Sequence, residues 1–139
     1  APCEAVPPPS AWRHEACDVL VVGAGPAGLA AARVAAACGA DVLVVDERAK
    51  AGGQYFKQPG DGFRIDEHAL DAQFAEGRRL LAEARAAGAR FLFSATVWGA
   101  FDEDGIALVH EGGTVLVRAR RVVLAPGAYE RALPVPGWT

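Results

Sequence analysis

The stretch VLVVGAGPAG, residues 19–28, decides the fold of this chain, because an apolar run there leads into a glycine-rich turn. Residues 17–22 are almost wholly apolar and rich in β-branched side chains, which is typical of a parallel strand buried on both faces. Pro26 favours the first turn of a helix, and the alanine-rich segment after it ends at Gly39, a common helix-terminating residue. The stretch therefore predicts a strand, a tight turn and a helix.

A second buried strand follows directly, because residues 41–46 (DVLVVD) repeat the β-branched apolar pattern. Two strands joined by a helix within about 30 residues are typical of a parallel unit with a right-handed connection. The sequence therefore predicts that the two strands lie side by side, with their carboxyl ends at the same edge of a sheet.

The glycine spacing of the turn, Gly23-x-Gly25-x-x-Gly28, fits a dinucleotide site in this context. Gly23 allows the tight turn, Gly25 lets the backbone approach a pyrophosphate, and Gly28 lets the helix pack on the sheet. Free N–H groups at the helix N-terminus attract phosphate, and Asp46, about 20 residues further on, is placed to accept hydrogen bonds from an adenosine ribose. The sequence predicts dinucleotide binding; the alternative is a structural turn in a related scaffold that has lost its ligand.

The remaining sequence predicts one more helix and then a change of strand pattern. Asp66 is expected to cap a helix that runs to about Ala87, and residues 90–94 form a third strand. Short alternating runs separated by the turns DEDG and EGG indicate an antiparallel meander, and a further buried strand follows it. The three runs of the meander are residues 96–101, 105–110 and 114–119, and the final strand is residues 120–125.

The meander also indicates which dinucleotide binds. A plain NAD domain continues by repeating βα units, whereas this chain inserts a meander after the third strand, and that departure favours FAD. The predicted fold class is α/β, a Rossmann-like FAD/NAD(P)-binding domain whose parallel sheet carries an antiparallel β-meander insertion. Residues 1–15 are rich in proline and lack periodicity, so they are expected to form an extended arm before the domain at residues 16–139.

Composition and charge argue against several other classes of function. The 14 basic and 17 acidic residues give a net charge of −3 and form no block, so nucleic acid is not an expected partner. The sequence has no apolar stretch near the roughly 20 residues that cross a membrane and no signal-like N-terminus, so a cytoplasmic protein is expected. Cys3, Cys17 and Cys38 fit neither a zinc spacing nor a CxxC redox pair, and no metal site is expected.

Two stretches of the chain resemble a known family. DVLVVGAGPAGLAAARVAAACGADVLVVDERAKAGGQYF, residues 18–56, looks like the N-terminal FAD-binding segment of the glutathione reductase-like flavoproteins, which carry two dinucleotide-binding domains. The GGQ stretch and the closing RVVLAPGAYERALPVPGWT, residues 121–139, resemble more narrowly the opine oxidase A, hydrogen cyanide synthase flavoprotein and sarcosine oxidase alpha subunits. This resemblance implies an N-terminal, incomplete portion of the FAD domain, with NAD(P) bound by a second domain beyond it.

The resemblance also implies which residues bind FAD. The glycine turn would line the pyrophosphate, the strand-end carboxylates would face the adenosine ribose, and the GGQ loop would lie near the flavin. One backbone position would recognise adenine, and the closing loop would cover the cofactor. Pro126 stands where the family usually has Thr, and Asp46 where it more often has Glu. The implied residues are, in that order, Gly23, Gly25, Pro26, Ala27 and Gly28; Asp46 and Glu47; Gly53 and Gln54; Val97; and Ala125 and Gly127.

By the same resemblance, the chain is expected to belong to an FAD-dependent oxidoreductase, or a subunit of one, that oxidises the C–N bond of an amino acid or opine by hydride transfer to flavin. Its substrate would be a small amine or amino acid, and a heteromeric subunit would complete catalysis or accept the electrons. Two alternatives stay open: a noncatalytic dinucleotide-binding subunit of a heteromeric dehydrogenase, and an NAD(P)H-dependent enzyme like the flavoprotein disulfide reductases. No residue of the sequence is identified as a catalytic acid, base, nucleophile or redox thiol.

Overall fold

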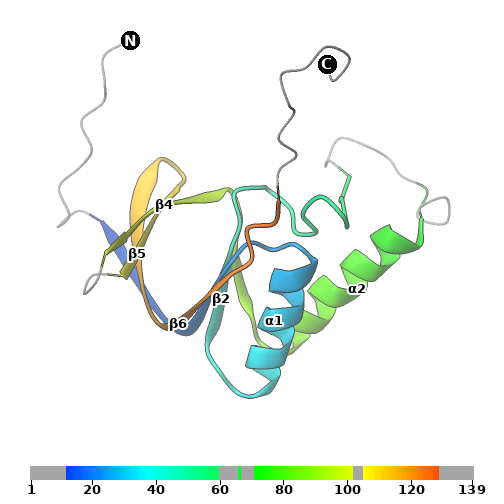
Figure 1. The fold of residues 1–139 in the computed structure, drawn as a ribbon, viewed down its shortest axis with the longest axis horizontal. Helices are drawn as coiled ribbons and strands as arrows, with labels where there is room; N and C mark the ends of the chain where they lie inside the picture. Colours follow the sequence, from blue (N-terminus) through cyan, green and yellow to red (C-terminus); the bar gives the residue numbers. More distant parts are fainter. Residues whose placement is uncertain (1–11, 60–65, 67–70, 102–104, 129–139) are drawn as a thin grey trace, which may run out of the picture.

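The computed structural model describes residues 12–59, 66, 71–101 and 105–128 (Figure 1). Neither of the helices found in these ranges is long and apolar enough to span a membrane. The elements and their bounds are β1 (Arg13–Val22), α1 (Pro26–Ala37), β2 (Val42–Val45), α2 (Ala72–Ala86), β3 (Arg90–Leu92), β4 (Ala95–Phe101), β5 (Gly105–His110) and β6 (Gly113–Leu124).

The strands found in the described residues form one sheet in the order β3-β2-β1-β6-β5-β4. β1 pairs in parallel with β2 and β6, and β2 pairs in parallel with β3, whereas β4, β5 and β6 pair in antiparallel fashion. α1 connects β1 to β2, and α1 and α2 lie side by side (Figure 1). This arrangement confirms the expected α/β class, in which an antiparallel meander extends a parallel sheet.

Apolar clusters cover both faces of the sheet. The first cluster packs α1 and α2 against β1 and β2, and it includes Val44 and Leu80. The second lies against the opposite face, where Leu20 and Val45 pack with Leu108 of β5. β2 is buried on both faces, which explains why its sequence is apolar throughout and does not alternate.

One strand takes the place of two that the sequence predicts. Separate strands were expected at residues 114–119 and 120–125, but β6 runs through both. Its first part pairs with β5, and nearly its whole length pairs with β1, which itself begins at Arg13, earlier than the sequence predicts. Polar side chains at the junction do not end the strand, because pairing with β1 satisfies the backbone groups and Arg120 forms an ion pair with Asp18 at 3.4 Å.

The start of α2 also differs from the prediction. The sequence predicts Asp66 as the N-cap, but α2 begins at Ala72 and its cap is Asp71, whose carboxylate accepts a hydrogen bond from the Phe74 N–H at 2.9 Å. The assignment of Asp66 is therefore wrong. Both aspartates precede a helical pattern, and only the folded chain shows which carboxylate meets an N–H group of the first turn. Residues 67–70, which the predicted helix included, lie outside the described residues.

The cap of α2 gives a test of this part of the fold. Asp71→Ala is expected to lower the free energy of unfolding by about 1 kcal/mol, because the Phe74 N–H loses its acceptor. Urea unfolding followed by circular dichroism measures the change. Asp66→Ala is the matched control and is expected to change the free energy by less than about 0.5 kcal/mol. A larger loss in the control than in Asp71→Ala would contradict this cap.

Candidate functional site

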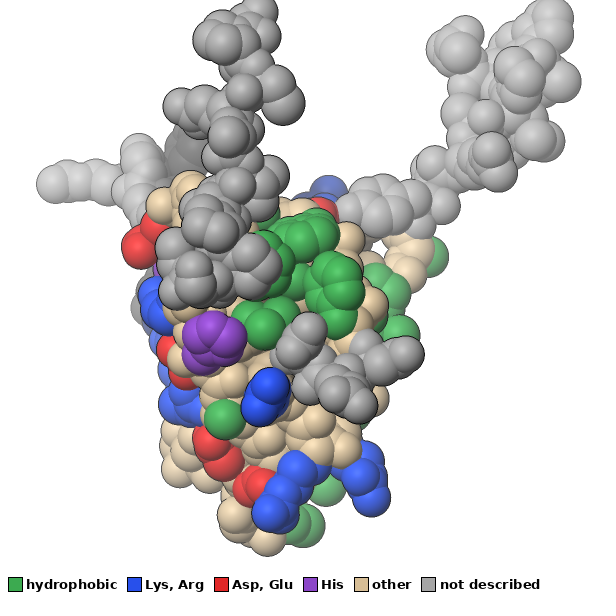
Figure 2. Space-filling model, turned by 90° about the vertical axis from the view of Figure 1, so that its left-hand side faces the viewer, with side chains coloured by type: hydrophobic (Ala, Val, Ile, Leu, Met, Phe, Trp, Pro, Cys, Tyr) green, Lys and Arg blue, Asp and Glu red, His purple; other side chains and the backbone are tan. Residues whose placement is uncertain are grey.

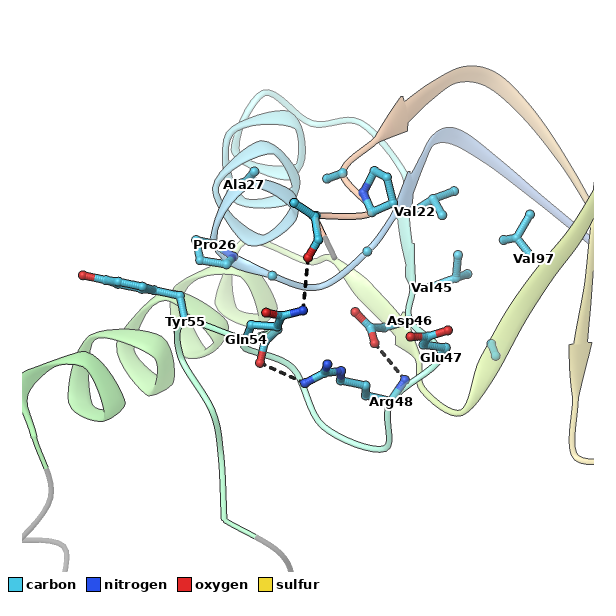
Figure 3. Close-up of a pocket in the computed structure, with 18 of the residues that line it drawn as sticks. Val22, Pro26, Ala27, Val45, Asp46, Glu47, Arg48, Gln54, Tyr55 and Val97 are labelled. Carbon is cyan, nitrogen blue, oxygen red and sulfur yellow. Dashed lines mark hydrogen bonds between the residues drawn. The ribbon is translucent and has the colours of Figure 1, made fainter. Parts of the chain in front are cut away.

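A cavity of about 570 Å³ opens at the carboxyl ends of β1, β2 and β6 (Figure 3). Its volume lies within the roughly 300–1,000 Å³ typical of small-molecule sites, and this edge of a parallel sheet is where doubly wound folds bind ligands. Every residue that the sequence predicts as a cofactor ligand lines the cavity except Gly28. Those that line it are Gly23, Gly25, Pro26, Ala27, Asp46, Glu47, Gly53, Gln54, Val97, Ala125 and Gly127.

Two glycines of the turn are required by close packing of the backbone. Gly23 has a φ of +105°, and a Cβ atom placed on it would lie 2.2 Å from the carbonyl oxygen of Ala125. A Cβ atom on Gly28 would lie 1.8 Å from the carbonyl oxygen of Gly23. Gly28 is therefore needed to seat α1 against the turn, which explains why it lies behind the cavity and does not line it.

Backbone hydrogen bonds fix the turn between the strand ends. The Gly23 N–H donates to the carbonyl of Val45 at 2.8 Å, and the Ala125 N–H donates to the carbonyl of Val22 at 2.8 Å. Gly25 is the N-cap of α1 and provides no side-chain capping bond. The N–H groups of the first turn and the positive end of the helix dipole are therefore directed to the cavity wall, where an anion is favoured.

Carboxylates lie at the end of β2, across the cavity from α1. The Asp46 carboxylate is held by the backbone: Oδ2 accepts a hydrogen bond from the Ala24 N–H at 2.6 Å, and Oδ1 accepts one from the Arg48 N–H at 2.8 Å. Glu47 is exposed and lies next to Asp46 at the cavity (Figure 3). The cavity therefore combines a wall that attracts anions with a wall that accepts hydrogen bonds, which suits a molecule carrying both phosphates and hydroxyls.

The loop after β2 returns across the cavity and closes one side of it. Gly53 packs against the turn so closely that a Cβ atom on it would lie 3.1 Å from the Cα atom of Gly25. The Arg48 guanidinium donates to the carbonyl of Gly53 at 3.3 Å, and the Gln54 amide donates to the carbonyl of Ala128 at 3.1 Å (Figure 3). These bonds connect the loop both to the end of β2 and to the segment after β6.

An aromatic side chain anchors this loop to α2. Phe56 is buried, and Gly77 of α2 leaves room for it, because a Cβ atom on Gly77 would lie 2.5 Å from the Cβ atom of Phe56. Tyr55, its neighbour, has 59% of its surface exposed and lines the cavity. The loop thus uses Phe56 for packing on α2, whereas the ring of Tyr55 points away from Asp46 and Glu47 (Figure 3).

The cavity also includes residues that the sequence did not single out. Most of them are direct neighbours of predicted residues, so a wider window around each motif would have found them. The start of β4 lines the cavity because a contact between distant segments holds it there: the Ala95 N–H donates to the carbonyl of Asp46 at 2.9 Å. Pro126, at the family's usual Thr position, lines the cavity too. The missed residues are Val22, Val45, Arg48, Ala95, Thr96 and Ala128.

The described residues that line the cavity offer groups for binding. Cys17 is buried on the second face of the sheet, and burial raises the pKa of its thiol, which disfavours a reactive thiolate. The described ranges contain no group of His, Cys, Asp and Glu that could hold a metal ion. The lining residues offer backbone N–H groups, carboxylates and amides for phosphate and ribose, so redox chemistry at this site would come from a bound cofactor.

The chain is similar to several known proteins. A family model described as pyridine nucleotide-disulphide oxidoreductase matches residues 17–139. The opine oxidase A-subunit of Rhizobium meliloti (strain 1021) is 37% identical over 122 residues, a match that covers 88% of this chain and 27% of the relative. The sarcosine oxidase alpha-subunit of Corynebacterium sp. (strain P-1) is 39% identical over 137 residues, covering 86% of this chain and 14% of the relative. The chain thus spans about a quarter or less of these relatives' length.

A solved structure shares the fold. The geranylgeranyl bacteriochlorophyll reductase-like protein from Thermoplasma acidophilum superposes with a TM-score of 0.65 at 26% identity, covering 82% of this chain and 40% of that chain. These matches confirm the resemblance that the glycine turn, the GGQ stretch and the closing stretch indicate in the sequence. Because the family model matches residues 17–139, the chain belongs to the pyridine nucleotide-disulphide oxidoreductase family.

Proposed function

We propose that this chain provides the adenosine and pyrophosphate part of an FAD site in an oxidoreductase, or a subunit of one, that oxidises the C–N bond of a small amine, amino acid or opine. The observation that carries the binding part is the cavity, which places the N-terminus of α1 opposite the carboxylates after β2. The substrate class rests on the names of the relatives, which are subunits of an opine oxidase and of a sarcosine oxidase.

The residues present fit the adenosine diphosphate part of such a cofactor. Gly25 and Gly53 carry no side chain and pack backbone against backbone, so a phosphate can approach the main chain of the turn. Asp46 and Glu47 offer acceptors for ribose hydroxyls, and Val97 at the start of β4 provides a backbone edge for adenine. Gln54 and Tyr55 mark the side on which the flavin would lie.

When bound, FAD would supply the redox chemistry, the acceptance of a hydride from the carbon next to the substrate nitrogen, which would leave the substrate as an iminium ion. The residues of this chain bind and orient the cofactor. The α1 N-terminus offsets the charge of its phosphates, and the carboxylates hold its ribose. Burial of Val45 and Ala95 behind the cavity keeps water from that wall.

A heteromeric partner is part of this proposal. Two of the relatives are named as subunits, and this chain spans at most about a quarter of each. The described cavity residues include no thiol, and their carboxylates, Asp46 and Glu47, are assigned here to the ribose. A further subunit or domain would therefore provide the amine site or accept the electrons. A second, NAD(P)-binding domain and a cytoplasmic location stay predictions from the sequence.

The proposal is tested by mixing the chain with excess FAD and separating it by gel filtration. We expect the visible flavin spectrum to elute with the protein, authentic FAD to be released on denaturation, and ADP to compete with FAD for the site. All flavin eluting as free cofactor would contradict the binding part. Anaerobic addition of sarcosine or an opine, with the parent protein's other subunits present, is then expected to bleach the bound flavin.

One alternative keeps the site and changes its role. A noncatalytic dinucleotide-binding subunit is favoured by the described lining residues, which include no thiol and whose carboxylates, Asp46 and Glu47, lie where the ribose would bind. Bound flavin that no amine bleaches in the assembled protein, while removal of FAD dissociates the subunits, would select this alternative over the oxidase.

A further inference from the structure

Large apolar side chains are exposed on the meander, outside the cavity. Trp98 and Phe101 of β4 have 47% and 42% of their surface exposed, and Val109 of β5 has 43%. Hydrophobic side chains gather on the side of the molecule where β4 and β5 lie (Figure 2). An exposed group of large apolar side chains on a folded domain marks an interaction surface.

The strand register places these side chains on one face of the meander. Leu108 belongs to the apolar cluster on the other face, and side chains alternate along a strand, so Val109 points away from that cluster. Phe101 pairs with Gly105, which is four residues before Val109 on β5 and therefore shares its face. Trp98 lies at an irregularity of β4, and its ring meets the Phe101 ring edge-on, with 5.7 Å between the centroids.

The chain that enters β1 contributes a further ring to this face. Trp12 meets Trp98 edge-on, with 6.0 Å between the ring centroids, a geometry that favours aromatic pairs. The next residue, Arg13, is already paired with β6, so the sheet fixes the position at which the chain reaches the meander. We call the four residues the aromatic patch: Trp12, Trp98, Phe101 and Val109.

The sequence before Trp12 suits an aromatic surface. Residues 1–11, APCEAVPPPSA, lie outside the described residues, and they include three successive prolines at positions 7–9. Successive prolines favour the polyproline II conformation, which loses little entropy on binding, and segments of this kind bind to grooves lined with aromatic rings. Covalent geometry keeps Pro9 within about 11 Å of Trp12. Glu4 is the only charged side chain of the segment, so docking would desolvate little charge.

We propose that residues 1–11 bind the aromatic patch of their own chain, with Pro7, Pro8 and Pro9 packed against the rings of Trp98 and Phe101. The three prolines span about 6 Å in polyproline II, which matches the 5.7 Å between those rings. The covalent tether gives the segment an effective concentration in the millimolar range, an advantage that a second copy lacks in dilute solution. This contact does not depend on dinucleotide binding.

The test measures how far solvent reaches the aromatic patch in the 139-residue chain. A soluble gadolinium chelate broadens the NMR signals of exposed groups, and the native chain is compared with the triple variant Pro7→Ser, Pro8→Ser, Pro9→Ser. We expect the broadening of the Trp98 indole N–H and of the Phe101 ring to rise about threefold in the triple variant, because the packing of the prolines on the rings is lost.

Two controls accompany this comparison. Glu4→Gln changes the same segment and keeps its three prolines, so native broadening of the patch is expected. Val34 of α1, with 55% of its surface exposed and outside the patch, is the internal reference and should broaden equally in every variant. Equal broadening of Trp98 and Phe101 in the native chain and the triple variant would overturn the proposal.

The segment itself gives a second readout. The amide signals of Val6 and Ser10 are expected to differ between the native chain and a synthetic peptide of residues 1–11, and to move toward those of the peptide in Phe101→Ala. Phe101 is exposed, so this variant is expected to fold. Native signals that already match the peptide would contradict docking. Protection of Trp98 that grows with protein concentration, with dimers in light scattering, would assign the patch to a second copy and overturn the proposal.

Discussion

Gly28→Ala is expected to lower the free energy of unfolding by about 3 kcal/mol and the thermal midpoint by roughly 10 °C. The new Cβ atom would lie 1.8 Å from the carbonyl oxygen of Gly23 and 3.3 Å from a side-chain carbon of Val21. The nearest atom belongs to the backbone of the glycine turn, so relief requires α1 to move away from β1. Thermal and urea unfolding measure the loss.

Gly39→Ala serves as the control for this prediction. Gly39 has a φ of +86°, and a Cβ atom there would meet nothing within 4 Å. Gly39→Ala therefore carries the cost of a left-handed backbone, about 1–2 kcal/mol, and no steric clash, whereas Gly28→Ala carries the clash. If Gly28→Ala lowers the free energy of unfolding no more than Gly39→Ala does, α1 can move away from the turn at little cost. That result would contradict the close packing of α1 against the turn.

Gly25→Ala is expected to have the largest effect on binding, with affinity for FAD or ADP falling about 100-fold and stability changing by about 1 kcal/mol or less. Gly25 has a φ of −75°, and a Cβ atom on it would be 3.9 Å from the Cα atom of Gly53, an ordinary contact. The fold therefore accepts alanine. The added methyl group would keep phosphate oxygens away from the N–H groups of the turn.

Gly113→Ala is the matched variant outside the cavity. Its Cβ atom would lie 3.7 Å from the carbonyl oxygen of His110, also an ordinary contact, at the start of β6. We expect native affinity in Gly113→Ala. Calorimetry with ADP measures the affinities. Equal affinity in Gly25→Ala and the native chain would show that the pyrophosphate does not bind at this turn, and it would contradict the proposed binding mode.

The expected effects of these substitutions differ because the glycines of one motif have different surroundings. The spacing of the motif alone assigns a turn, a phosphate contact and a helix contact to Gly23, Gly25 and Gly28. The structure agrees for the helix contact, because Gly28 lies behind the cavity with no room for a side chain. It adds that Gly23 is also fixed by the segment after β6, through the carbonyl of Ala125. That second constraint joins residues about a hundred positions apart.

The sequence was least informative where a choice depended on pairing partners. Asp66 and Asp71 both precede a helical pattern, and Asp71 is the cap of α2. The junction between residues 114–119 and 120–125 is polar, but β1 pairs across it and makes one strand. In both cases the local pattern allows two outcomes: pairing with β1 decides the strand, and a hydrogen bond within the first turn of α2 decides the cap.

The sequence by itself determined the strand, turn and helix at residues 17–38, the second buried strand and the expectation of a dinucleotide, because hydrophobic period and glycine spacing act over a few residues. Only the tertiary structure decided that the Asp46 carboxylate is bound to the glycine turn and that Arg48 and Gln54 connect the loop across the cavity. The physical reason is that a hydrogen bond needs donor and acceptor within about 3 Å, and such proximity between distant segments arises only when the whole sheet is assembled.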